Sequence, residues 1–365
     1  MEFILTIGAF IIGFILVVIA IPQIILVAKD KRLFEAFEQR KIHTKIIPPL
    51  GGVAIFIGFT LSSIIATDGI SFDSLKYIIA SVILMFFIGL KDDLTNISAR
   101  KKLIVQAFAA VILITLGDVR FTNLHGILGS YQIGFLTSLI LTVFTMVAII
   151  NAFNLIDGID GLASGLAMLA ASTFGTWFFM EGNVQFAILS FALVGSLAGF
   201  FLYNVFGNRN KLFMGDTGSL IIGLVISTLV VKFNEFNIDK TASFAIAAAP
   251  SVSFAVIIIP LIDMLRVMSI RITQKRSPFS PDKNHIHHQL LALVPSHFKV
   301  TLIIIFTNAL LIAFALFLNY ISFNINIQFI LVFIMGLLIS LIPSIILKLK
   351  TSEKLKTAES ANQLS

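Results

Sequence analysis

Four polar side chains follow one another at intervals of three residues between two long apolar runs: Asn151, Asn154, Asp157 and Asp160. In a helix, each step of three residues moves a side chain by about 60° around the axis, so the four would spread over about half of the circumference. Polar groups at the edge of a bilayer need water or a cation, and ionisable ones mark functional sites by default. The stretch 151–165 is therefore a candidate site, and the alternative is a polar loop with a helix cap.

A pair of adjacent carboxylates, Asp92 and Asp93, ends another apolar run. Adjacent carboxylates repel each other unless a cation lies nearby. Together they could bind Mg²⁺, hold a phosphate through the metal, or take a proton from it. An isolated pair would suit a solvated helix end equally well.

A third acidic residue, Asp216, lies in the segment FMGDTGS at 213–219, just before a further apolar run. Asp, Thr and Ser are common N-cap residues, which is the simplest explanation of this segment alone. Its glycines would also let a phosphate or a metal approach the backbone, and a helix N-terminus favours an anion there.

The basic candidates include a histidine tract, His285, His287 and His288. Because the other polar clusters offer oxygen and no thiolate, they suit Mg²⁺ better than zinc, and the histidines are interpreted as donors to phosphate oxygens. Lys45, beside a Pro/Gly turn, could contact a diphosphate or an anionic lipid head group, or serve only as a topology signal. Arg266 and Arg271 could do likewise, or extend to the membrane surface.

The elements that must position these groups are membrane helices. The 365 residues are 58% hydrophobic and 12% charged, far from the roughly 25% charged residues of soluble domains. We predict an all-α, polytopic membrane protein, and the absence of cysteine excludes disulfides and thiolate chemistry. The pattern predicts eleven transmembrane helices, at about 3–28, 50–67, 76–90, 103–117, 134–150, 162–181, 184–204, 217–232, 243–268, 300–319 and 325–348.

The loops between these spans differ in charge. One alternate set holds 22 of the 26 Lys and Arg residues, which predicts a cytoplasmic C-terminus and an N-terminus outside. All four polar motifs then lie on the cytoplasmic side. The net charge of +7 comes from basic residues in these loops, where they set the membrane topology. We therefore expect the protein to interact with the lipid bilayer and not with nucleic acid. Residues 1–350 form one transmembrane catalytic domain, 351–365 a disordered tail, and 118–133 an outer loop with a small hairpin.

The motifs, taken in order, resemble a known family. The segments PLGG (49–52), GLKDD (89–93), NAFNLIDGIDG (151–161), FMGDTGS (213–219) and HIHH (285–288) are similar to those of the polyprenyl-phosphate N-acetylhexosamine-1-phosphate transferases, over roughly residues 1–320. The loop before HIHH resembles the bacterial enzymes that use UDP-N-acetylglucosamine. The branch that transfers phospho-N-acetylmuramoyl-pentapeptide typically has three consecutive histidines and an acidic residue, where this chain has Ile286 and Gln289.

The resemblance implies an enzyme of the bacterial inner membrane. It would move N-acetylglucosamine 1-phosphate from a UDP-sugar onto undecaprenyl phosphate, release UMP and so initiate a cell-envelope polysaccharide. The ion would be Mg²⁺, with Mn²⁺ as a substitute, and the ligands Asp216 and Asn154. The residues that would touch substrate or act in catalysis are Lys45, Asp92, Asp93, Asn154, Asp157, Asp160, Asn204, Phe213, His285, His287 and His288, with Asn204 and Phe213 in the uridine pocket.

Other functions are compatible with parts of this pattern. The donor could be another UDP-sugar, such as UDP-N-acetylmuramoyl-pentapeptide. A transporter or channel with an acidic coupling site is an alternative of another class, but transporter sites lie near the bilayer midplane, whereas these carboxylates lie at span ends. A non-catalytic membrane scaffold would not need every acidic position. The sequence leaves open whether the chain forms a homodimer.

Overall fold

The computed structural model describes residues 1–31, 47–67, 73–208, 210–277 and 284–363, with side chains as far as residue 350. These parts of the chain are almost entirely helical, because an apolar segment in a bilayer can satisfy its backbone groups only as a helix or a closed barrel. The helices are α1 (Glu2–Asp30), α3 (Gly51–Ala66), α4 (Asp73–Thr95), α5 (Ala99–Thr115), α6 (Phe135–Ile156), α7 (Leu162–Met180), α8 (Val184–Phe206), α9 (Gly215–Phe236), α10 (Ala249–Val256), α11 (Ile258–Thr273), α12 (Ile286–Leu293), α13 (His297–Tyr320) and α14 (Ile325–Gln363).

The prediction of a polytopic membrane protein is confirmed at this level. In the described residues eight helices are long and apolar enough to cross a membrane, or nine if the bent pair α10–α11 is one span. The predicted spans at 50–67 and 103–117 correspond to α3 and α5, which have 16 and 17 residues. Since about 20 residues cross a bilayer without adjustment, the count of eleven stays a prediction.

Helix α9 lies at the centre of the bundle and is the most buried of the long helices in the described residues. It packs against α3, α4, α6, α7 and α10. Its apolar residues occupy all sides from Leu220 to Val231, as expected of a helix without a solvent face. Gly223 allows α6 to come close, because a Cβ there would lie 2.5 Å from the Ile150 Cα.

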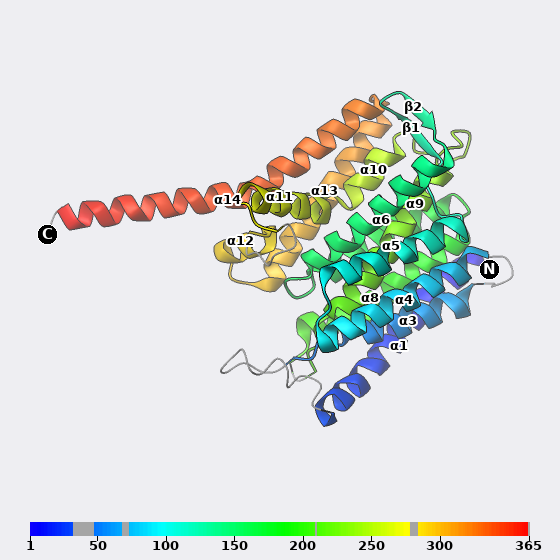
Figure 1. The fold of residues 1–365 in the computed structure, drawn as a ribbon, viewed down its shortest axis with the longest axis horizontal. Helices are drawn as coiled ribbons and strands as arrows, with labels where there is room; N and C mark the ends of the chain where they lie inside the picture. The colour runs from blue at the N-terminus through cyan, green and yellow to red at the C-terminus, as the bar shows by residue number, and fades with distance from the viewer. Residues whose placement is uncertain (32–46, 68–72, 209, 278–283, 364–365) are drawn as a thin grey trace.

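Helix α1 forms an outer layer on α8 and α3. Small residues permit the close approach, since a Cβ on Gly195 would meet the Phe10 carbonyl and one on Gly13 would meet Ser196. The opposite face of α1 exposes large apolar residues such as Ile11 and Ile15, as a lipid-facing surface does. Figure 1 shows α1 and α3 along one side of the bundle.

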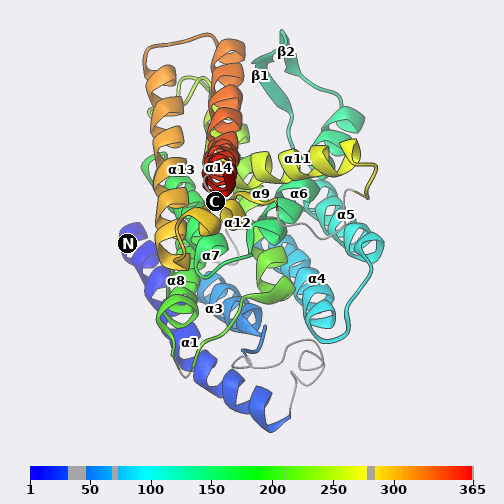
Figure 2. The same ribbon diagram turned by 90° about the vertical axis from the view of Figure 1, so that its left-hand side faces the viewer.

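The predicted span 243–268 is not one straight helix. It divides into α10 and α11, and the axes of these two helices are bent by 74°. In Figure 2, α11 runs close to horizontal, whereas α13 and α14 run close to vertical. Pro260 lacks an N–H, so the Val256 carbonyl four residues earlier loses its helical partner. Asn308 of α13 replaces it, donating to Val256 O at 3.0 Å and accepting from Ile259 N at 3.3 Å.

The small hairpin predicted within 118–133 is confirmed, while its position outside the membrane stays a prediction. Strands β1 (Asn123–Ile127) and β2 (Ser130–Gln132) pair antiparallel and lie at the opposite end of the bundle from α12 (Figure 1). Two hydrogen bonds from Thr122 to the Glu235 carboxylate, both 2.7 Å, fasten this loop to the end of α9.

Helix α14 extends well beyond the bundle. Its backbone stays helical to Gln363 through residues 351–363, the segment that the composition predicts to be disordered. Figure 1 shows this last part projecting away from the other helices. The predicted disorder of 351–365 and the predicted extent of one domain over 1–350 both stay predictions.

Candidate active site

Three helix ends meet at one point of the bundle: the carboxyl ends of α4 and α6 and the amino end of α9. Asn154 of α6 donates to the Asp216 carboxylate at 2.9 Å and to the Ser219 hydroxyl at the same distance. The backbone N–H of Asp216 donates to Asp93 of α4 at 2.7 Å. Three motifs that lie far apart in the sequence thus lie together in the structure.

The turn before α3 supports the loop before α9 from the outside. Gly51 N donates to Phe213 O at 2.8 Å, and Phe213 N donates to Pro48 O at 3.1 Å. The first residue of α9, Gly215, has a φ of +73°, which favours glycine. A Cβ there would also lie 2.4 Å from the Pro49 carbonyl oxygen, so the position has no space for a side chain.

Asp93 acts as a cap for α9 from a different helix. Its carboxylate accepts the backbone N–H groups of Asp216 and Thr217, at 2.7 and 3.0 Å, and the Thr217 hydroxyl. The first N–H groups of a helix have no partner within it, and no side chain at the N-cap position of α9 supplies one. Asp93 is 9% exposed and its oxygens are used in this cap, so its first role is to hold α9 in place.

Asp92 points to a different partner, the Lys102 side chain of α5. The ammonium group lies 2.7 Å from Asp92 Oδ2 and 2.6 Å from Asp216 Oδ2. The Ile97 N–H also donates to Asp92. A positive charge therefore bridges the acidic groups of α4 and α9, and Asp92 is the carboxylate of the pair that binds this charge, whereas Asp93 caps α9.

Asp157 directly follows α6 and is half-buried. Burial, and after it the negative charges of Asp216, Asp93 and Asp160, raise its pKa to about 7. Beside burial, the shift reflects several carboxylates close together, whose mutual repulsion a bound cation would relieve.

Asp160 is bound by groups from two other segments. Its carboxylate accepts from Lys211 Nζ at 2.6 Å and pairs with His297 Nδ1 at 2.9 Å, and its carbonyl accepts from Thr301 at 2.9 Å. The Lys211 ammonium lies 5.9 Å from the centre of the Phe213 ring. Asp160 therefore connects the loop before α7 with the loop before α9 and with α13.

The two predicted residues of the uridine pocket differ in exposure. Asn204 is 5% exposed and bridges two backbones, accepting from Gly161 N at 2.6 Å and donating to Leu212 O at 2.9 Å. Phe213 leaves 43% of its surface exposed beside Lys211. Of the two, Phe213 offers a free surface to a ligand, and Asn204 fixes the loops around it.

The histidine tract lies against the acidic stretch. A Cβ added to Gly158 would lie 2.1 Å from His287 Nε2, so the ring packs on the backbone next to Asp157. The His287 ring is 1% exposed, and burial lowers its pKa to about 3, so it is neutral. Its neighbours His288 and His285 have ring centres at 4.3 and 5.6 Å.

Comparison with known proteins identifies the relatives of this chain. The undecaprenyl-phosphate alpha-N-acetylglucosaminyl 1-phosphate transferase of Escherichia coli (strain K12) is 33% identical over 272 residues, which cover 73% of this chain and 71% of that protein. The probable undecaprenyl-phosphate N-acetylglucosaminyl 1-phosphate transferase of Bacillus subtilis (strain 168) is 32% identical over 297 residues, 81% of this chain and 80% of that protein. The model of glycosyl transferase family 4 matches residues 75–234.

The chain belongs to glycosyl transferase family 4. The resemblance predicted from the five motifs is thereby confirmed. The part of this family 4 chain that the model matches contains Asp92, Asp93, the stretch 151–165 and Asp216, and ends before the histidine tract.

The acidic centre of this family 4 protein could hold a divalent cation. Among the described residues, no three His, Asp or Glu side chains converge as a ready-made cage. Magnesium, however, is commonly held by one or two carboxylates together with water and substrate phosphates. The Lys102 ammonium lies between Asp92 and Asp216, where positive charge is favourable, and the side-chain oxygen of Asn154, whose nitrogen donates to Asp216, would be a further ligand.

Two residues that contact the predicted site groups were not predicted from the sequence. Lys102 was counted among the basic loop residues, although its place nine positions after Asp93 was visible. Asp263 was counted inside an apolar span, where an ionisable residue is itself a signal. Its carboxylate binds the histidine tract through His285 Nδ1 at 2.7 Å. Lys45, the remaining predicted residue, lies outside the described residues.

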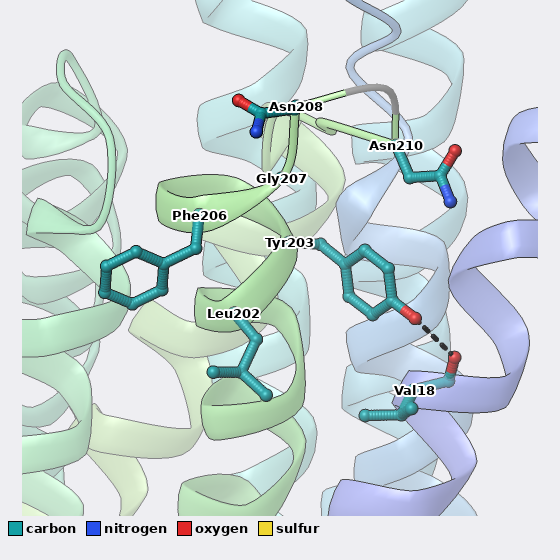
Figure 3. Close-up of a pocket in the computed structure, with 7 residues that line it drawn as sticks. All are labelled: Val18, Leu202, Tyr203, Phe206, Gly207, Asn208 and Asn210. Carbon is teal, nitrogen blue, oxygen red and sulfur yellow. Dashed lines mark hydrogen bonds between the residues drawn. The ribbon is translucent and has the colours of Figure 1, made fainter.

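A separate cavity of about 340 Å³ lies between α1 and α8, away from the carboxylates. Tyr203 donates across it to the Val18 carbonyl at 3.2 Å (Figure 3). Its lining is Val18, Leu202, Tyr203, Phe206, Gly207, Asn208 and Asn210. Since no charged side chain lines it, we assign the chemistry of this family 4 protein to the carboxylate site.

Proposed function

We propose that this protein transfers N-acetylglucosamine 1-phosphate from UDP-N-acetylglucosamine to undecaprenyl phosphate, releasing UMP. The observation that carries the proposal is the meeting of Asp92, Asp157 and Asp216 with Lys102 and His287 at the ends of membrane helices. The names of the relatives supply the acceptor and the sugar. A site at the end of the bundle can receive a soluble nucleotide from one side and a lipid from the other.

The reaction is an exchange of one phosphoanhydride bond for another. An oxygen of the lipid phosphate attacks the phosphorus that carries the sugar, the bond from that phosphorus to the bridging oxygen breaks, and UMP leaves with the electron pair. Such a transfer needs little covalent help and depends on alignment and charge neutralisation. A single displacement and a two-step route through a phosphoenzyme are distinguished by whether UMP is released in a burst without the lipid acceptor.

The residue roles follow from the geometry. Asp92, beside Lys102, accepts the proton of the lipid phosphate or orients its oxygen. Lys102 neutralises charge between Asp92 and Asp216, and neutral His287 donates a hydrogen bond to the donor diphosphate. Asp93 fixes the start of α9, and Asp160 fixes the loop before α9 through Lys211.

We assign Mg²⁺ as the cofactor, with Mn²⁺ as a substitute, because the available donors are oxygens. Asp216 and Asn154 would hold the ion. When bound, it supplies neutralisation of the diphosphate charge.

The proposed membrane arrangement has eleven spans, with α3 and α5 crossing as short helices and α10–α11 as one bent span. The N-terminus is outside and the C-terminus cytoplasmic, because 22 of the 26 Lys and Arg residues then lie in the cytoplasm. The site is at the cytoplasmic face of a bacterial inner membrane. This arrangement leaves the hairpin outside.

The test is incubation of the purified protein with undecaprenyl phosphate, Mg²⁺ and a panel of UDP-sugars that includes UDP-N-acetylmuramoyl-pentapeptide. We expect UMP and a lipid diphosphate of N-acetylglucosamine, both identified by mass. EDTA should stop the reaction, and excess Mg²⁺ should restore it. A burst of UMP without the lipid acceptor would indicate a phosphoenzyme.

Matched variants make this test specific. Asp92→Asn and Asp216→Asn should each reduce UMP release at least 1,000-fold, on the order of 4 kcal/mol of transition-state stabilisation, whereas Asp239→Asn in an exposed outer loop should behave as wild type. Full activity in both site variants would refute the assigned site. Proteoliposomes that move a solute but form no lipid-linked sugar would favour a transporter instead.

A further inference from the structure

The carboxylate of Asp263 is buried in α11, outside the motifs that define the site. It is 1% exposed, and its oxygens accept from His285 Nδ1 at 2.7 Å, from Ile286 N at 2.8 Å and from Arg266 at 3.0 Å. Arg266 in turn donates to the Asn284 carbonyl at 2.6 Å. Asp263 therefore fixes the start of the histidine tract through its first histidine and through the backbone beside it.

The contact with Asp263 determines which nitrogen of His285 carries a proton. A carboxylate accepts only, so Nδ1 must donate, and Nε2 of the neutral ring is then an acceptor. A guanidinium can only donate, and the Arg271 guanidinium lies 3.4 Å from this Nε2. Both ring nitrogens of His285 thus face protein groups, in the order Asp263, His285, Arg271.

His287 is in the opposite situation. Its ring is 1% exposed, and neither of its nitrogens has a hydrogen-bond partner among the described residues. A buried polar group without a partner is unfavourable, and native sites of this kind are commonly completed by a ligand. The ring packs on Gly158, next to Asp157. It also stacks on the ring of His285, which lies between His287 and Arg271.

From this contrast we propose that Asp263 is a positioning residue that acts through His285 to hold the Arg271 guanidinium at the nucleotide-sugar site, while His287 is the imidazole that meets the diphosphate. The inference rests on the proposed function and divides the histidine tract into a supporting and a contacting residue. A guanidinium suits this task because its planar donors match phosphate oxygens in pairs. Arg271 is 2% exposed, so its orientation depends on protein neighbours, and His285 is one of them.

The first test separates binding from folding. Asp263→Asn should raise the KM for UDP-N-acetylglucosamine about 10- to 100-fold, the usual range for losing the group that orients a ligand-contacting residue, with the KM for undecaprenyl phosphate unchanged. Asp263→Glu, which keeps the carboxylate, should recover most of the affinity. A loss of support without a role in binding would lower the amount of folded protein and leave both KM values unchanged, and this result would overturn the proposal.

Because Asp263→Asn leaves the buried Arg266 without its counter-charge, a second variant keeps that pair intact. In His285→Asn the amide nitrogen can take the place of Nδ1, but the acceptor Nε2 that faces Arg271 is lost. We expect the same rise in KM for the nucleotide sugar, and the double variant with Asp263→Asn should add less than threefold. Independent, multiplicative effects would refute an action of Asp263 through His285.

The variant His287→Gln completes the comparison. We expect weaker binding of UDP, measured by its shift of the melting temperature, without the loss of stability that the His285 and Asp263 variants show. Wild-type binding of UDP by His287→Gln would overturn the division of roles. If the wild-type protein releases no UMP with any UDP-sugar, the proposed function fails, while the binding of UDP to these variants still decides this inference.

Discussion

Adjacent residues of one type do different work in this protein. Asp92 and Asp93 are indistinguishable in the sequence, yet Asp93 receives three hydrogen bonds at the start of α9, whereas Asp92 pairs with Lys102 of α5. The difference arises because successive side chains of α4 point about 100° apart, one toward α9 and one toward α5.

This difference predicts opposite effects on stability. Asp93→Ala should lower the free energy of unfolding by about 2–3 kcal/mol, because it leaves the first N–H groups of α9 without a partner. Asp92→Ala should abolish UMP release and change the melting temperature little, since Lys102 keeps Asp216 as a partner. Melting temperatures in detergent check both, and equal losses in the two variants would contradict the assigned roles.

His287 should make the protein sensitive to acid. Its pKa of about 3 lies below the usual value of 6.5, so between these values the unfolded chain binds a proton that the folded protein refuses. Stability is therefore unaffected above pH 6.5 and falls as the pH drops below it, by about 2 kcal/mol at pH 5.

Melting temperatures at pH 7.5 and pH 5 for wild type and His287→Gln measure this effect. The variant cannot titrate at this position, so it should lose less stability on acidification than the wild-type protein does. Identical losses would show that His287 is not buried in its neutral form.

For individual residues, the sequence indicated which side chains belong to the candidate site but not which contacts each of them makes. The types and spacing of Asp92, Asn154, Asp216 and His287 indicated a phosphate and cation site. Which carboxylate caps a helix depends on a contact across 123 positions, from Asp93 to Asp216, which no local pattern encodes. The same holds for the pairing of Asp160 with Lys211 and His297.

Among the elements, the break between α10 and α11 has the clearest physical cause. Pro260 removes one helical hydrogen bond, and a side chain from α13 replaces it. Apolar composition predicted the span but not the 74° bend, because the bend needs both the proline and Asn308, 48 residues later. The bend places Asp263 and Arg271 beside the histidine tract.

Asn308 should therefore be important for stability. Asn308→Leu would leave the Val256 carbonyl and the Ile259 N–H without partners inside the bundle, at about 1–2 kcal/mol each. Thr307→Val is the control, since its hydroxyl bonds only to its own helix. Melting temperatures should show a large loss for Asn308→Leu alone, and a loss of the same size in the control would contradict this explanation.

On the scale of the whole molecule, one end of the bundle carries the charged site and the other carries the hairpin. The chain has no cysteine, so a single introduced thiol reports its side of the membrane without interference. Leu128 in the hairpin is 89% exposed, and Lys275 after α11 is also exposed.

Labelling with a maleimide that cannot cross membranes tests the orientation. Leu128→Cys should react in intact cells with a permeable outer envelope, and Lys275→Cys only after the inner membrane is opened. The reverse pattern would place the site outside and contradict a reaction with a cytoplasmic nucleotide. Wild-type protein, which has no thiol, is the control for background.

The burial of α9 has a consequence for how the protein is made. During synthesis a segment leaves the translocation channel for lipid according to its own hydrophobicity, and α9 is less hydrophobic than the outer helices α1, α13 and α14. Its neighbours α3, α4, α6 and α7 all precede it in the chain, and only α10 follows. We therefore expect helices that are already in the membrane to retain α9. The contacts of Asp216 with Asp93 and Asn154 would then form during translation.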